Sequence, residues 1–147
     1  MARTKARISN GTILYYKRSG GAYIAVAEVI NLPSPERTTT DIKASHLNSD
    51  NYHHEYLPGM IEPGQFECDF NYYSTYYTAL EDIQYDREVL EWKLEVPDNI
   101  GSPGTASTLV LQGYINKLQA FDAQTDEKMT GKLGVKVTGP VTWTGAT

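Results

Sequence analysis

The chain has 147 residues, a mass of 16.4 kDa, a formal net charge of -5 and one cysteine. This length predicts a single domain over residues 1–147 with a sizeable core, while the acidic balance argues against a surface that reads nucleic acid. The lone cysteine excludes an internal disulfide, and no apolar run is long enough for a membrane span, so we expect no membrane insertion.

The first third of the chain predicts a short arm followed by three strands. Residues 1–10 are basic and lack an apolar run, which indicates a mobile N-terminal arm and not a signal peptide. Residues 12–17 are rich in β-formers and end at a Ser-Gly-Gly hairpin signal, so residues 22–30 are expected to return as the second strand. Two prolines break that run, and residues 36–43, with three consecutive threonines, predict the third strand.

Residues 44–63 show no sustained period, contain one Pro-Gly pair at residues 58–59 and end at a second, at residues 63–64. Loops longer than about 12–15 residues are uncommon in compact domains and are usually functional, so we predict a protruding loop. Its three histidines lack the spacing of known zinc motifs, and we therefore predict no metal site. The candidate contact residues of the loop are His46, Asn48, Asp50, Tyr52, His53, His54, Glu55 and Tyr56.

Residues 64–72 alternate without interruption, as a half-buried strand does. The apolar face carries Phe66, Cys68, Phe70 and Tyr72. The polar face carries Gln65, Glu67, Asp69 and Asn71. Glu67 and Asp69 lie about 7 Å apart on one face, a spacing that a pair of glycosidase carboxylates could use. No apolar neighbour on that face would raise either pKa, and the chain has no nucleophile motif, so we predict no catalytic residues.

The only helical pattern follows residue 73, with Ser74 as the predicted N-cap and an expected end near Tyr85 and Asp86. The stripe that indicates the helix consists of Tyr76, Ala79, Leu80 and Ile83, spaced for one face.

Three more strands are predicted after the helix. Residues 88–96 and 132–138 alternate cleanly, and residues 141–143 extend the last strand or cap it. Residues 109–121 indicate a long, bulged strand, because the alternation slips after Ile115.

Six to eight strands and one helix predict a mainly β domain, either a β-sandwich or a partly open barrel, with one flanking α-helix. We expect no cofactor. The predicted core residues are Phe66, Cys68, Phe70, Leu80, Ile83, Trp92, Leu94, Leu133, Val135 and Val137.

This order of elements resembles the tail tube (major tail) proteins of long-tailed phages, in the group that includes the lambda tube protein. The resemblance spans residues 11–143. It rests on the initial hairpin, the Pro-x-Pro and Thr-rich strand, and a Leu-Pro-Gly … Gly-x-Phe-x-x-x-Phe segment at residues 57–70. A Gly-Tyr-Ile … Val-Lys-Val-Thr-Gly ending at residues 113–139 completes it.

The resemblance implies a structural, non-enzymatic subunit that forms hexameric rings with a continuous inner β-barrel. The rings would stack into a hollow tube for the genome, in a virion tail assembled in the host cytoplasm. Residues 64–72 and part of 36–43 would line an acidic lumen that repels phosphate, and the loop at residues 44–63 would reach the next ring. The charge would be mixed if Lys43, Lys93 and Lys136 also faced the lumen.

Other partners implied by the resemblance are a tape-measure protein, tail terminator and tip proteins, and DNA in transient passage. Two other functions stay open. One is the tube protein of a bacterial contractile injection system of the type VI secretion kind. The other is a carbohydrate-binding β-sandwich with a stacking platform made of Tyr72, Tyr73, Tyr76 and Tyr77.

Overall fold

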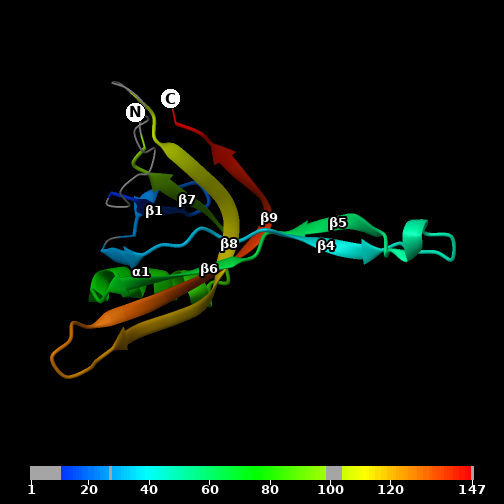
Figure 1. Ribbon diagram of the computed structural model, residues 1–147. Helices are drawn as coiled ribbons and strands as arrows, with labels where there is room; N and C mark the ends of the chain where they lie inside the picture. Colours follow the sequence, from blue (N-terminus) through cyan, green and yellow to red (C-terminus); the bar gives the residue numbers. More distant parts are fainter. Residues whose placement is uncertain (1–10, 27, 99–103, 147) are drawn as a thin grey trace, which may run out of the picture.

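The computed structural model describes residues 11–26, 28–98 and 104–146 (Figure 1). The predicted N-terminal arm, residues 1–10, lies outside this part of the chain. The elements in chain order are β1 (Ile13–Lys17), β2 (Ile24–Ala25), β3 (Val29–Asn31), β4 (Thr38–Lys43), the 3-10 helix η1 (Asp50–Tyr52), β5 (Tyr56–Glu62), β6 (Gln65–Asn71), α1 (Ser74–Tyr85), β7 (Leu90–Val96), β8 (Ser107–Asp122) and β9 (Thr130–Thr144). The predicted mainly β class with one helix is confirmed.

Seven strands form one sheet in the order β2-β1-β7-β8-β9-β6-β3, and β4 pairs with β5 outside it. The long strands β8 and β9 belong to two parts of this sheet. We call β2, β1, β7 and residues 107–113 of β8, with the end of β9, the β7 half. We call β3, β6, residues 130–136 of β9 and the rest of β8 the β6 half.

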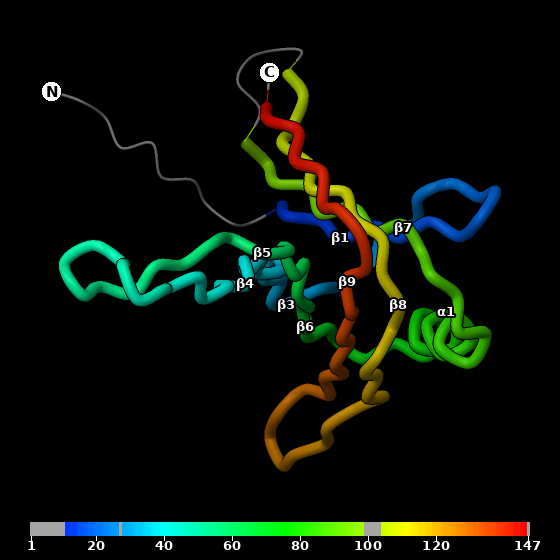
Figure 2. The backbone as a smooth tube through the Cα atoms, turned by 90° about the vertical axis from the view of Figure 1, so that its right-hand side faces the viewer, coloured from blue at the N-terminus to red at the C-terminus, as the bar shows by residue number. Residues whose placement is uncertain are grey.

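The β8–β9 ladder bends the sheet between its two halves. Its register shifts at three places, between Val110 and Gln112, between Ile115 and Lys117, and between Gln119 and Asp122. Such bulges increase the local twist and bend a strand, and the shift after Ile115 lies where the sequence alternation slips. The sheet therefore curls into a half-barrel, as Figures 1 and 2 show, and its two halves take the place of the two sheets of a sandwich.

The core lies on the inner side of this curl. All ten core residues proposed from sequence are buried, and they join Leu14, Tyr16, Leu90, Leu109, Leu111 and Ile115 in one cluster. Trp92 of β7, with no exposed surface, is the largest of the fully buried side chains. Its ring lies 5.9 Å from that of Tyr16 and 6.4 Å from that of Phe66, and its Nε1 donates to the carbonyl of Gly113 at 3.1 Å.

Helix α1 ends where predicted, but it begins one residue earlier, so the predicted N-cap is wrong by one residue. Tyr73 occupies the cap position with an extended backbone, and it makes no side-chain capping bond. Ser74 is already helical, and its carbonyl accepts a hydrogen bond from the Thr78 hydroxyl at 2.8 Å. Leu80 and Ile83 are the buried residues that attach the helix to the core, next to β8.

The single strand predicted over residues 22–30 is wrong. The structure has two short strands there, and they lie at opposite edges of the sheet: β2 pairs with β1, and β3 pairs with β6. Glu28, just before β3, has a φ of 56°, which no strand residue adopts. The turn lets the chain leave β1 and cross to the far edge, a step that alternation in sequence does not reveal.

The loop predicted over residues 44–63 is wrong in its second part, because residues 56–62 form β5. Together with β4 this strand makes a hairpin that projects from the body on the side away from α1 (Figures 1 and 2). We call β4, β5 and the residues between them the arm. Pro58 and Gly59 interrupt the strand pattern, and both faces of β5 are largely exposed, so its sequence shows no alternation.

Replacing Gly131 with alanine is expected to destabilise the fold by about 1–3 kcal/mol. A Cβ at this position would lie 2.6 Å from Phe70 Cζ and 2.7 Å from the carbonyl oxygen of Ala120. Denaturant unfolding of the variant measures the loss. Gly145→Ala, where a Cβ would meet nothing within 4 Å, is the matched control. Equal denaturant midpoints of unfolding for the two variants would contradict the close packing around Gly131.

Burial raises the pKa of the Cys68 thiol to about 12, with smaller contributions from Asp69 and Glu67. The folded state therefore holds the neutral thiol, whereas an unfolded cysteine ionises near pH ~8.5. This contribution to stability is present below pH ~8.5 and is lost as pH rises toward 12. A maleimide should modify Cys68 at pH ~8 only after denaturant is added, with Cys68→Ala as the unreactive control. Rapid labelling of the folded chain would show that the thiol is accessible.

Candidate assembly surfaces

The arm carries apolar side chains that the fold leaves in solvent. Ile42 and Leu57 face each other across the two strands, yet they are 50% and 55% exposed. Met60 and Ile61 are 86% and 65% exposed. A two-stranded hairpin is only marginally stable in water by itself. Apolar contact with another surface would stabilise the arm, which makes it a candidate interface.

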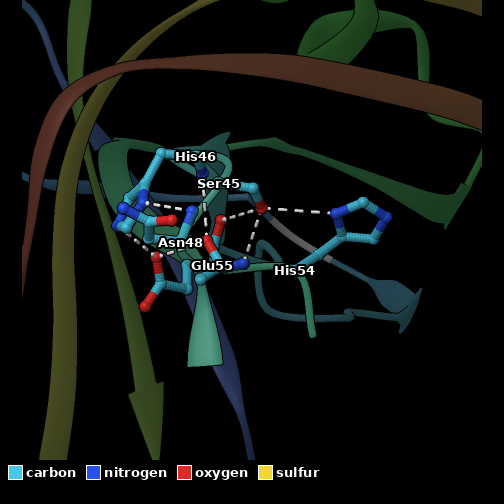
Figure 3. Close-up of polar contacts among 6 residues, drawn as sticks. Ser45, His46, Asn48, His54 and Glu55 are labelled. Carbon is cyan, nitrogen blue, oxygen red and sulfur yellow. Dashed lines mark hydrogen bonds and ion pairs between the residues drawn. The ribbon is translucent and has the colours of Figure 1, made fainter. Parts of the chain in front are cut away.

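A polar network orders the tip of the arm (Figure 3). The Ser45 hydroxyl accepts a hydrogen bond from the Glu55 backbone N–H at 2.8 Å and lies 3.3 Å from His54 Nδ1. The Glu55 carboxylate accepts a hydrogen bond from the Ser49 hydroxyl at 2.9 Å and lies 3.5 Å from His46 Nε2. These contacts join the two ends of the connection between β4 and β5, so the tip is a defined shape.

The structure places all eight loop residues singled out from sequence on the arm. Seven lie in its tip and Tyr56 begins β5, and all eight are exposed. Within the described ranges, no group of three or more His, Cys, Asp and Glu side chains could hold a metal ion. The arrangement suits contact with a protein surface, because all eight residues are exposed on a projecting hairpin.

The polar row of β6 comes together on one face as predicted, but lysines lie beside it. Gln65 is exposed, while Glu67, Asp69 and Asn71 are half-buried. Lys117 Nζ lies 3.4 Å from Glu67 Oε2, and Asn116 donates to the Gln65 side chain at 3.2 Å. These partners come from β8, which lies two strands away from β6 in the sheet.

Strand β9, between β6 and β8, adds two more lysines to this face. In the register of the sheet Lys132 lies opposite Asp69, and Lys136 lies opposite Gln65. Directly opposite residues of an antiparallel pair project to the same face. On β7, Lys93 lies 4.7 Å from the ring centroid of Tyr15 and belongs to the other half of the sheet.

The β6 half has incomplete strand edges. β3 pairs with β6 only at Asp69 and Phe70, which leaves residues 65–68 without a strand on that side among the described elements. β7 pairs with residues 107–113 of β8, so among the described strands residues 114–122 have only β9 as a neighbour. Open edges present unpaired backbone groups to other chains. No local sequence pattern indicates these edges, because strand pairing depends on segments far apart in the chain.

The four tyrosines considered as a carbohydrate platform do not form one flat surface. Tyr72 contacts Phe121 edge-on, with centroids 5.8 Å apart and planes at 69°. Tyr73 and Tyr76 form a separate tilted pair at 5.1 Å. A flat platform for a glycan chain needs exposed rings that share one plane, and the planes of Tyr73 and Tyr76 differ by 50°, so this arrangement does not favour such a platform.

Comparison with protein families gives one match: the family described as phage tail tube, TTP, lambda-like, over residues 5–147. No curated protein matches the chain. No helix in the described part of the chain is long and apolar enough to cross a membrane.

Solved structures with the same fold come from several kinds of particle. A chain from the tail of an empty gene transfer agent particle, with C6 symmetry, aligns with a TM-score of 0.75 and 13% identity, over 95% of this chain and 100% of its own. A chain from the structure of the sheath/tube terminator of an extracellular contractile injection system, PVC, aligns with a TM-score of 0.69 and 12% identity. The alignment covers 98% of this chain and 100% of that chain. The SPP1 tail tube aligns with a TM-score of 0.61 and 9% identity. The alignment covers 91% of this chain and 76% of the SPP1 chain. At these identities the likeness concerns the fold alone.

Proposed function

The chain belongs to the lambda-like phage tail tube family, and from this premise we propose that it forms hexameric rings that stack into the hollow tube of a virion tail. The family match covers residues 5–147 and supports a structural subunit of the tube. The C6 symmetry of the gene transfer agent tail, which shares the fold, supports the ring size. The proposed role involves no catalytic step.

The observation that carries ring formation is the pair of incomplete edges in the β6 half. Residues 114–122 of β8 form one edge, and β3 with residues 65–68 of β6 forms the other, at the far side of the same half. We propose that one edge of each subunit pairs with the other edge of its neighbour. A sheet continued in this way around a ring closes into a barrel and leaves no edge open.

The polar face of the β6 half would then line the lumen. Its opposite face packs into the core through Phe66, Cys68 and Phe70, so it cannot meet solvent in the ring. Gln65, Glu67, Asp69 and Asn71 are the β6 residues that we place toward the lumen. DNA would pass along this wall, and a tape-measure protein would occupy the lumen before it.

The arm is the proposed contact between successive rings, as expected for residues 44–63. It projects beyond the sheet, its tip is ordered by internal hydrogen bonds, and its apolar side chains are exposed. Terminator and tip proteins would take the place of a next ring at the two ends of the tube. The tube of a contractile injection system is the second candidate, because the PVC terminator shares the fold.

Electron microscopy of the purified full-length protein tests the proposed function. We expect hollow tubes, or rings with six-fold symmetry that polymerise as the protein concentration rises. A protein that remains a monomer in sedimentation across conditions that favour assembly would contradict the proposal.

Deleting residues 48–54 should preserve the fold and the rings but abolish stacking, because the tip network and its exposed side chains are removed. Circular dichroism checks the fold, and micrographs measure tube length. A Gly-Ser linker of equal length in place of residues 48–54 is the matched control, since it keeps the chain length and removes only the side chains. Tubes of normal length from both variants would show that the tip does not connect rings.

A further inference from the structure

The acidic row of β6 is part of a larger charged face. The pairing register of β6, β9 and β8 brings two sets of groups to the polar side of the β6 half. The carboxylates are Glu67, Asp69 and Asp122, and the ammonium groups are Lys117, Lys132 and Lys136. The two sets are equal in number, so this face carries no net charge.

The opposite charges also alternate in space. Glu67 and Lys117 form an ion pair at 3.4 Å while both side chains stay accessible, at 42% and 62% exposure. Asp69 lies directly opposite Lys132 in the ladder, where Cβ atoms are about 4.5–5.5 Å apart. Both separations are shorter than the screening length of about 10 Å at 0.1 M salt. A polyanion at that distance therefore meets paired charges and not a continuous negative field.

We propose that the wall of the conduit is charge-compensated, so that it neither repels a phosphodiester polymer strongly nor retains it. This inference rests on the proposed function, because it assumes that the β6 half faces the lumen. An uncompensated lysine row would bind phosphates and release counterions, with an affinity that depends steeply on salt. Here Lys117 and Lys132 each lie beside a carboxylate on the same face, and that carboxylate competes with phosphate for the ammonium group.

The pair Glu67–Lys117 offers a test by charge exchange. Tubes of the wild type, E67K, K117E and the double exchange E67K/K117E are first checked by electron microscopy. They are then sedimented with a fluorescent oligonucleotide at low and at moderate salt. We expect weak retention by the wild type, at least about tenfold tighter binding by E67K at low salt, and loss of that gain at moderate salt. K117E should bind no more than the wild type, and the double exchange should return to the wild-type level.

Several results would overturn the inference. Tight binding by wild-type tubes would show that the lysines are not compensated, and a double exchange that binds like E67K would show that the two residues do not act as a pair. A closed circular DNA has no free end to thread into a tube, so equal capture of E67K tubes by that probe would place the face outside the lumen. Absence of wild-type tubes would instead refute the proposed function before any probe is added.

The second pair keeps the test available if E67K fails to assemble. D69K and D69K/K132E repeat the exchange at the neighbouring pair in the same ladder. The same pattern is expected: a gain of binding in the single variant and its reversal in the double variant. Equal binding by D69K and wild-type tubes would contradict compensation at this pair.

Discussion

The packing of Trp92 connects the two halves of the curled sheet. Its ring contacts Tyr16 from β1 and Phe66 from β6, and its indole nitrogen donates to the carbonyl of Gly113 in β8. Strands far apart in the sheet order meet on this one side chain, and the bulges of β8 and β9 permit the bend that brings them together. The apolar faces of β6 and of residues 130–136 of β9 are thereby committed to the core, and their polar faces are left for another role.

The same fold leaves groups that one subunit cannot satisfy. The edges of the β6 half lack full pairing, and the arm exposes Ile42, Leu57 and Met60 to solvent. In a protein that acts alone such edges invite aggregation and are usually protected. In a member of a tube family they are explained by assembly, because neighbouring copies can complete both the ladder and the apolar contacts. Incompleteness of the monomer is thus part of its function.

The polar wall illustrates where local sequence stops being informative. The alternation over residues 64–72 correctly assigned Phe66 and Cys68 to the core and the carboxylates to the other face. It indicated an acidic surface because it considered one strand. Lys117, fifty residues beyond Glu67, and Lys132 reach the same face from β8 and β9. Charge on a sheet is a property of the pairing register, which only the assembled strands define.

The mainly β class, the helical stripe from Tyr76 to Ile83, the alternating strands and the resemblance to tail tube proteins follow from the sequence without any structure. These features depend on local periodicity and on motif order, which the chain carries residue by residue. Tertiary structure alone decided that residues 22–30 divide between opposite edges and that residues 56–62 pair with β4 to build the arm. It also decided which lysines face the acidic row. Each of these outcomes depends on which distant segments become neighbours, and backbone hydrogen bonds between strands are the same for almost any side chain.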